Sequence, residues 1–385
     1  MMSKKSPQLR FEGFTDDWEE RKLNEVSDIY DGTHQTPKYQ DDGVMFLSVE
    51  NIKTLTSNKF ISREAFEDEF KIRPQRGDVL MTRIGDIGTA NVVETDEDLA
   101  YYVSLALFKS EELNPYFLQA SIYAPFVQDQ IWKRTLHIAF PKKINKNEIG
   151  QVPINVPTLE EQTKIGSFFK QLDDTITLHQ RKLDLLKEQK KGYLQKMFPK
   201  NGAKVPELRF AGFADDWEER KLSDIVDRFD NLRVPITASD RKPGDTPYYG
   251  ANGIQDYVEG FTHNGEFILV AEDGANDLKN YPVQYVNGKV WVNNHAHVLQ
   301  GKKTITDNKF LMNAIKNFNI EPFLVGGGRA KLNADVMMKL NILLPTFVEQ
   351  EKIGSLFSLL DKTIALHQRK LDLLKEQKKG FLQKM

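Results

Sequence analysis

LHQRKLDLLKEQKKG, residues 178–192, returns letter for letter at residues 366–380. The similarity extends over residues 158–197 and 346–385, where 31 of 40 aligned positions are identical at a constant offset of 188. Apolar residues recur in both copies at alternating spacings of four and three, which is the heptad pattern of a helix that needs a partner helix. We therefore predict two long helices, each roughly 60 Å long, that cover one another's apolar seams as an antiparallel or a parallel pair.

The predicted seams also carry polar residues, since His179 and Lys190 fall on the first and His367 and Lys378 on the second. The apolar residues expected in the coiled coil are Ile165, Phe169, Leu172, Ile176, Leu183 and Leu186, and in the second copy Ile353, Phe357, Leu360, Ile364, Leu371 and Leu374.

A second repeat precedes each helix. QLRFEGFTDDWEERKL at residues 8–23 returns as ELRFAGFADDWEERKL at residues 207–222. The chain is therefore a duplicated unit of globular segment and helix. Expected boundaries are 1–157 for the first globular segment, 158–200 for the first helical region, 201–345 for the second globular segment and 346–385 for the second helical region. The sequences between the shared ends differ sharply, which favours two copies of one binding role with different targets.

The composition excludes several kinds of site and segment. The 385 residues include no cysteine, which removes disulfides, thiolate nucleophiles and cysteine zinc sites and fits a reducing cytoplasm. No apolar run approaches the length of a membrane span, and the first residues lack the apolar core of a secretory signal. The net charge is −2, so any nucleic-acid binding must depend on local clusters of charge.

The globular segments are expected to be rich in short strands, because short apolar or alternating runs lie between turn residues. We expect strands at 79–81, 103–108, 267–271, 290–292 and 298–299, with final strands at 151–156 and 339–344, and helices at 115–133 and 307–317. Each long helix is expected to begin at an N-cap threonine, Thr158 or Thr346, with Glu161 or Glu349 completing a capping box.

Three patterns were weighed as chemical sites. His295 and His297 lie two residues apart and are half of a metal site at most, since no further ligand lies at a telling distance. NPYF, residues 114–117, resembles the NPP[YF] loop of amino-methyltransferases but lacks its second proline, and Asn-Pro more often begins a helix. Trp18 and Trp217 occupy equivalent positions and are expected to have a core or docking role rather than to stack on bases. We therefore assign no catalytic residue and no metal site.

Two basic segments lie at matched positions. GGGRAKLN at residues 326–333 combines three glycines with Arg329 and Lys331, and AFPKKIN at 139–145 places Lys142 and Lys143 at the corresponding point. Such loops fit a phosphate or groove contact, and the alternative is a solvated turn.

VPTLEEQTKIGSFF at 156–169 and LPTFVEQEKIGSLF at 344–357 resemble the proline–EQ–helix element of the specificity subunits of type I restriction-modification enzymes. GDVLMTRIGDIG at 77–88 and YYGANGIQDY at 248–257 also resemble recognition-domain segments of that family. The resemblance covers the whole chain. In the second half, however, Ala271 aligns with Arg83, which puts a shared arginine contact in doubt.

The resemblance implies a non-catalytic bacterial, cytoplasmic DNA-binding subunit. Its α+β fold would hold two strand-rich target-recognition domains apart by a long antiparallel two-helix coiled coil. Each domain would read half of a bipartite double-stranded DNA target, and the coiled coil would set the spacer. Implied partners are two methylation subunits, which use S-adenosylmethionine, and two restriction subunits, which use ATP and Mg. The chain itself would bind no cofactor and no membrane.

On this reading we expect a set of polar and basic residues to contact DNA. They are Arg83, Ser104, Lys142, Lys143, Asn145, Tyr249, Asn252, Asn294, Arg329, Lys331 and Asn333. Two other classes stay open, a protein-binding scaffold and a self-contained enzyme. Salt-dependent, sequence-selective DNA binding would distinguish a specificity subunit from the protein-binding scaffold. Catalytic activity of the chain alone would distinguish the self-contained enzyme from a specificity subunit.

Overall fold

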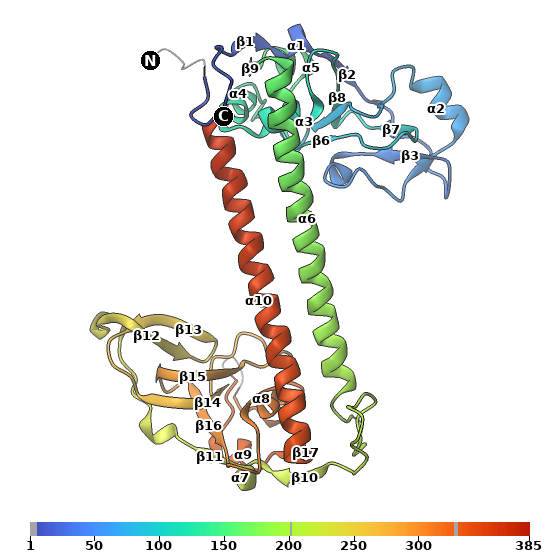
Figure 1. Cartoon of the computed structure of the whole chain (residues 1–385). Coiled ribbons are helices and arrows are strands. Elements are labelled where there is room, and N and C mark those ends of the chain that lie inside the picture. The colour runs from blue at the N-terminus through green and yellow to red at the C-terminus, as the bar shows by residue number, and fades with distance from the viewer. Residues whose placement is uncertain (1–5, 201, 327–329) are drawn as a thin grey trace. The chain divides into compact units, whose positions relative to one another are not determined.

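The computed structural model describes residues 6–200, 202–326 and 330–385. The chain forms two compact units (Figure 1). Unit 1 comprises residues 1–180 together with 369–385, and unit 2 comprises residues 181–368. Each long helix therefore contributes one part to each unit. None of the helices within the described residues is long and apolar enough to cross a membrane.

Unit 1 holds a sheet of order β2-β8-β5-β6, a smaller sheet of order β4-β3-β7, and the pair β1-β9. Helix α3 packs against β5 and β6. The elements are β1 (Glu19–Lys22), α1 (Leu23–Val26), β2 (Asp28–Asp31), β3 (Val44–Leu47), η1 (Val49–Asn51), β4 (Phe60–Ile61), α2 (Arg63–Glu69), β5 (Val79–Thr82), β6 (Ala90–Val92), β7 (Leu99–Tyr101), β8 (Leu105–Lys109), α3 (Pro115–Tyr123), α4 (Pro125–Lys133), α5 (Lys146–Gly150), β9 (Pro153–Val156) and the long helix α6 (Leu159–Lys196).

Unit 2 holds one larger sheet, of order β11-β16-β14-β15-β12-β13, and the pair β10-β17. Helix α8 packs against β14, β15 and β16. The elements are β10 (Glu218–Lys221), α7 (Leu222–Ile225), β11 (Val226–Arg228), η2 (Asp230–Leu232), η3 (Ala238–Asp240), β12 (Pro243–Gly250), β13 (Gly253–Val258), β14 (His263–Ala271), β15 (Val283–Val292), β16 (Ala296–Gly301), α8 (Asn308–Lys316), η4 (Glu321–Phe323), α9 (Ala334–Met337), β17 (Asn341–Leu344) and the long helix α10 (Phe347–Lys384).

The two long helices run antiparallel within each unit. In unit 1, Phe168 contacts Phe381 with 5.0 Å between ring centroids, and Asp173 binds Lys378 at 2.6 Å, so residue numbers rise on α6 as they fall on α10. In unit 2, Asp361 pairs in the same way with Lys190. The antiparallel alternative is therefore confirmed inside each unit, and the two seam lysines pair with aspartates.

The predicted apolar seam residues are buried or half-buried throughout. The N-terminal part of each helix, however, belongs to a globular core. Ile165 and Phe169 pack into the core of unit 1 with Trp18, and Ile353 and Phe357 pack into the core of unit 2 with Trp217. The core position expected for the two tryptophans is confirmed, at 3% and 1% exposure. The seam thus joins helix to domain as well as helix to helix.

The duplicated ends of the units form one common frame. The EERK strand β1 pairs antiparallel with β9, and β10 pairs with β17 in the matching register. The glutamine of each EQ pair stabilises this frame through hydrogen bonds. Gln162 accepts from the Asn114 amide at 2.9 Å and donates to the Pro157 carbonyl at 3.0 Å, and Gln350 makes the equivalent bonds to Asp307 and Pro345.

Some expected elements differ from those observed. Thr158 accepts a hydrogen bond from the Glu161 amide at 3.4 Å, which confirms it as an N-cap, while the carboxylates of Glu161 and Glu349 bind arginines of the upstream repeats. The single helix expected at 115–133 is two helices, because Pro125 lacks the N–H that would continue the first. The charged EERK strands escaped prediction because they show no apolar alternation.

Candidate nucleic-acid interface

Three separate segments of unit 1 meet at the end of β5. The Arg83 amide donates to the Ser104 carbonyl at 2.9 Å, and the Ile144 amide donates to the Arg83 carbonyl at 2.9 Å. The Gly85 amide reaches the Lys142 carbonyl at 2.8 Å. We call this region, residues 83–85, 104 and 142–144, edge 1.

Unit 2 builds the same arrangement at the end of β14. The Glu272 amide donates to the His295 carbonyl at 2.8 Å, and the Leu332 amide donates to the Glu272 carbonyl at 2.7 Å. Lys331 bridges to Asp273, as Lys143 bridges to Ile84 in unit 1. We call residues 272–274, 295 and 331–332 edge 2. The two basic loops expected at matched positions do therefore occupy equivalent places.

The equivalence corrects the sequence alignment. By backbone hydrogen bonding, Arg83 corresponds to Glu272 rather than to Ala271. The side chains there form ion pairs of opposite polarity. Arg83 is buried, pairs with Asp31 and donates to the Ile144 carbonyl at 3.1 Å, whereas Glu272 accepts from Arg233 at 2.7 Å. One backbone frame thus carries reversed charges in its two copies.

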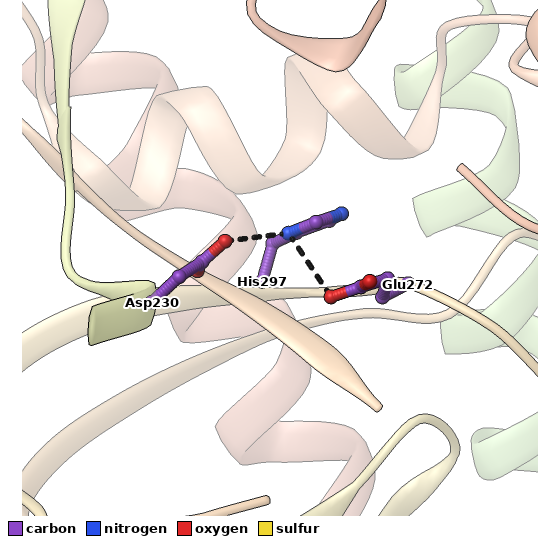
Figure 2. Close-up of side chains that lie close together, drawn as sticks. All are labelled: Asp230, Glu272 and His297. Carbon is purple, nitrogen blue, oxygen red and sulfur yellow. Dashed lines mark hydrogen bonds and ion pairs between the residues drawn. The ribbon is translucent and has the colours of Figure 1, made fainter. Parts of the chain in front are cut away.

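Glu272 of edge 2 forms a cluster with Asp230 and His297 behind that edge (Figure 2), in which His297 is buried and the two carboxylates are half-buried. His297 Nδ1 lies 2.8 Å from Asp230 Oδ2 and 3.6 Å from Glu272 Oε2, and its Nε2 lies 2.8 Å from the Leu332 carbonyl oxygen. Both ring nitrogens of His297 therefore face an oxygen atom within this network.

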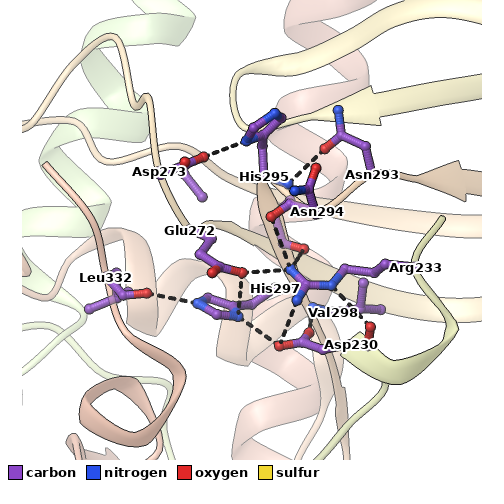
Figure 3. Close-up of polar contacts among 12 residues, drawn as sticks. Asp230, Arg233, Glu272, Asp273, Asn293, Asn294, His295, His297, Val298 and Leu332 are labelled. Carbon is purple, nitrogen blue, oxygen red and sulfur yellow. Dashed lines mark hydrogen bonds and ion pairs between the residues drawn. The ribbon is translucent and has the colours of Figure 1, made fainter. Parts of the chain in front are cut away.

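Cations complete this cluster (Figure 3). Arg233 binds Glu272 at 2.7 Å, and Lys331 binds the other oxygen of Glu272 at 2.9 Å. Burial alone would raise the pKa of Asp230, but hydrogen bonds from His297 and the Val298 amide, with nearby positive charge, lower that pKa below its ordinary value. Burial alone would also raise the pKa of Glu272, but hydrogen bonds from Arg233 and Lys331 lower that pKa below its ordinary value.

The histidine pair weighed as half of a metal site is split between two carboxylates. His295 Nδ1 lies 2.5 Å from Asp273, while His297 faces Asp230. The three side chains Asp230, Glu272 and His297 bring ligand atoms within 4.8 Å of one another, a spacing that a metal could use. Arg233 and Lys331 already pair with those carboxylates, and both ring nitrogens of His297 face oxygen atoms. The chemistry of the cluster therefore fits a structural polar network that braces edge 2.

The residues predicted in unit 1 all lie on or beside edge 1. Lys142, Lys143 and Asn145 are exposed, and Lys142 Nζ lies 4.6 Å from the centre of the Trp132 ring. Ser104 is buried, and its hydroxyl accepts from the Val49 amide at 3.2 Å. Arg83 and Ser104 thus have structural partners, whereas the other three present polar groups to solvent.

In unit 2, Asn252 fixes the turn between β12 and β13 against the segment after β14. Its side chain donates to the Gly274 carbonyl at 2.8 Å and accepts from the Asn276 amide at 2.9 Å. Asn294 is exposed in the turn between β15 and β16, and Tyr249 is half-buried on β12. Asn252 and Asn294 thus come from turns beside edge 2, and Tyr249 comes from strand β12.

The loop residues of edge 2 are described in part. Lys331 lies on the edge itself and Asn333 is the half-buried N-cap residue of α9. Arg329 lies outside the described residues. The sequence did not predict Asp273 and Arg233 at edge 2, and it indicated His295 only as a possible metal ligand. It also did not predict the apolar tip of the unit 1 loop. The signal for that tip was present as Ile138 and Phe140 beside two lysines.

The family model for the type I restriction modification DNA specificity domain matches residues 15–188 and 214–376. The chain belongs to this family. The two matched stretches follow the duplication, since each runs from one DDWEERKL segment into the long helix that follows.

Two relatives place the chain further within the specificity-domain family. A Haemophilus influenzae protein named as a type I restriction enzyme specificity subunit is 43% identical over 154 residues, which cover 40% of this chain and 39% of that protein. The match thus spans about two fifths of the relative's length. A Methanocaldococcus jannaschii protein, named as the MjaX type I restriction enzyme specificity subunit, is 22% identical over 95% of this chain and 92% of its own length.

A solved structure shares the fold along almost the whole chain. The S subunit of a type I restriction-modification system from M. genitalium superposes with a TM-score of 0.73, at 15% identity, over 98% of each chain. At that identity the likeness concerns the fold alone.

Proposed function

We propose that this chain is the DNA-specificity subunit of a type I restriction-modification complex, and that each unit reads one half of a bipartite target. The observation that carries the proposal is the duplicated edge. Edges 1 and 2 share one hydrogen-bonded backbone frame, while their side chains differ in size and reverse in charge. A protein that must hold two different half-sites in the same way needs such a constant frame with variable contacts.

The exposed groups suit the two kinds of contact that DNA recognition requires. Lys142 and Lys143 would neutralise phosphates, which gives affinity without sequence information. Asn294 and His295 lie in one turn and offer hydrogen-bonding groups of the kind that read base edges. Asp273 holds the His295 ring in place at 2.5 Å, so this reader would be preorganised.

The recognition domains would comprise residues 1–157 and 201–345, and the helical regions 158–200 and 346–385 would set the distance between half-sites. A continuous helix of 38 residues is stiff over its length, which suits a spacer. We propose that the chain itself performs no catalysis and binds no cofactor. Two methylation subunits with S-adenosylmethionine, and two restriction subunits with ATP and Mg, would supply the chemistry at the chosen site.

The proposal is tested by exchanging residues 24–157 for the corresponding segment of another specificity subunit, and mapping methylated adenines by single-molecule sequencing. One half of the target should change and the other half should stay. The reciprocal exchange of residues 223–345 serves as the matched control and should change the other half. A change in both halves after either exchange would refute independent reading, and sequence-independent binding by the parent chain would favour the protein-binding scaffold.

A further inference from the structure

The loop of edge 1 carries two apolar side chains at its tip that contact almost nothing. Ile138 is 99% exposed and Phe140 is 105% exposed. The base of the loop is fixed, because the Leu136 amide donates to the Lys143 carbonyl at 2.7 Å and the Lys142 carbonyl accepts from Gly85 at 2.8 Å. A tethered loop thus holds a phenylalanine and an isoleucine in water, at an energetic cost that a binding partner would remove.

The side chains around the base of this loop are aromatic and basic. Trp132 is 54% exposed, the ring of His137 lies 4.3 Å from it between centroids, and Lys142 lies over its face. Residues 130–146 include five lysines and arginines and no carboxylate. Asp129, just before this stretch, pairs with Lys133, and Asp86, in the turn beside Gly85, accepts from the Thr89 hydroxyl at 3.0 Å.

We propose that the loop 136–143 inserts Phe140, with Ile138 beside it, into a base step of the half-site that unit 1 reads. This inference rests on the proposed function, since it requires unit 1 to bind DNA. Proteins that deform DNA use apolar wedges of this kind between base pairs, and flanking cations neutralise the phosphates on either side. The ring of Phe140 would recover on the bases the contact that it lacks in the free protein.

Duplex DNA fits this tip better than a protein partner does. Two apolar side chains ringed by lysines form a far smaller patch than the core of a stable protein interface, which is also depleted of lysine. The counterpart loop in unit 2 has the same bridged base, from Val325 to Lys331, but its sequence is rich in glycine. The sequences between the two bridged bases differ, as expected where two loops meet two different DNA sequences.

The test uses the full chain assembled with its methylation subunits, and duplex targets with 2-aminopurine placed in turn at each position of half-site 1. The wild-type assembly should raise the fluorescence at one base step, because unstacking relieves quenching. Phe140→Ala should abolish that rise and weaken binding about tenfold, the order expected for one base–aromatic stack. The salt dependence should stay unchanged, since no cation is lost.

Two further variants separate the interpretations. Phe126→Ala removes a phenylalanine that is 41% exposed at the start of α4 and should behave as wild type. Phe140→Trp should keep the fluorescence rise. If Phe140→Ala leaves both affinity and fluorescence at wild-type levels, the wedge is refuted. If it weakens only the assembly with methylation subunits, the tip is a protein contact and the wedge is equally refuted. Absence of sequence-selective binding by the wild-type assembly would instead show that the proposed function itself has failed.

Discussion

The guanidinium of Arg10 holds the carboxylate of Glu161 through two hydrogen bonds of 2.8 Å each. Arg209 and Glu349 repeat this pair in unit 2, at 2.7 and 2.8 Å. Both glutamates have no exposed side-chain surface. Each arginine belongs to the repeat near the start of its globular segment, and each glutamate lies in the first turn of the long helix that follows. The two repeats seen in the sequence therefore form one buried arginine–glutamate ion pair in each unit, which we call the joint.

Removing this joint should destabilise the unit that contains it. Arg10→Ala leaves the buried Glu161 carboxylate without its counter-charge, so we expect a loss of about 3–5 kcal/mol in the free energy of unfolding. Arg209→Ala should cost a similar amount in unit 2. The control is Arg21→Ala, whose partners Glu19 and Glu25 are exposed and whose loss should leave the free energy of unfolding close to that of the wild type. Denaturant unfolding gives the values, and equal losses for Arg10→Ala and Arg21→Ala would refute the joint.

The sequence predicted the duplication and the helices because both depend on local pattern. The 3.5-residue period of the seam and the letter-for-letter repeats need no tertiary information. Partners distant in sequence could not be predicted in this way. Arg10 and Glu161 are far apart in the chain, so Glu161 was assigned to a local capping box that its spacing also satisfied. The antiparallel direction was likewise open until the pairs of Lys190 and Lys378 were seen.

The candidate site was predicted only in its polar loop residues. Lys142, Lys143, Asn294 and Lys331 stand in turns, where sequence signals are strong. Arg83 was matched to Ala271 because sequence similarity placed the strands one residue out of register, and backbone hydrogen bonding was needed to match it to Glu272. The apolar tip of edge 1 was missed because isoleucine and phenylalanine in a sequence predict burial.

The loss of stability at acid pH, here called the acid limb, should depend on the cluster of Asp230, Glu272 and His297 behind edge 2. The folded-state pKa values of Asp230 and Glu272 are lowered, so their stabilising contribution is complete above the ordinary carboxyl range near pH 4 and is lost as pH falls through the lowered values. The melting temperature of the wild type should thus fall below about pH 4.5. Asp230→Asn should be less stable at pH 7 and should show a shallower acid limb.

Calorimetry between pH 3 and pH 7 measures this difference. Asp227→Asn, at an exposed position three residues earlier, is the matched control and should follow the wild-type curve. An Asp230→Asn curve parallel to wild type at all pH values would show that the cluster does not contribute through ionised Asp230.

Unit 1 has a pocket at a place that an aromatic ring fills in unit 2. Phe198 packs on Trp217, Phe310 and Phe357 at centroid distances of 6.0, 5.6 and 6.0 Å. In unit 1, a pocket of about 220 Å³ is lined by residues that include the equivalent Trp18 and Phe169 with Met385.

Filling this pocket should stabilise unit 1. A variant that carries Phe-Pro-Lys, the residues that follow Met197, directly after Met385 should bury the added phenylalanine and raise the free energy of unfolding by about 1.5–3 kcal/mol. Extension with Gly-Pro-Lys is the control and should leave the melting temperature unchanged. Equal effects of the two extensions would mean that the pocket does not accept the ring.

The basic residue of each loop should act through phosphate contacts. Lys143 is exposed, so Lys143→Ala should weaken DNA binding and reduce the slope of log affinity against log salt by about one unit. Lys331→Ala should act in the same direction but less strongly, because Glu272 holds Lys331 at 2.9 Å in the free protein. Arg63→Ala, which removes an exposed cation already paired with Asp98, should leave the slope unchanged. An unaltered slope for Lys143→Ala would assign that residue to a solvated turn.

The long helices should act as the ruler between half-sites, if the proposed function is right. Four residues inserted after Lys187 lengthen α6 by roughly 6 Å, which corresponds to about two base pairs of DNA at 3.4 Å each. Four residues nearly preserve the heptad seam, whereas two would rotate it away from its partner. The half-sites should stay the same while the preferred spacer grows by about one to three base pairs.

A second insertion makes this test sharper. Because Lys190 pairs with Asp361 in an antiparallel pair, Lys187 lies roughly one turn away, near Ile364. Lengthening α6 alone must bulge one helix against the other, so the single variant should also lose stability. Adding four residues after Thr363 as well lengthens both helices at the same level and should recover the stability while keeping the longer spacer. Single-molecule mapping of methylated adenines measures the spacer, and an active double variant with an unaltered spacer would show that the recognition domains, not the helices, set the distance.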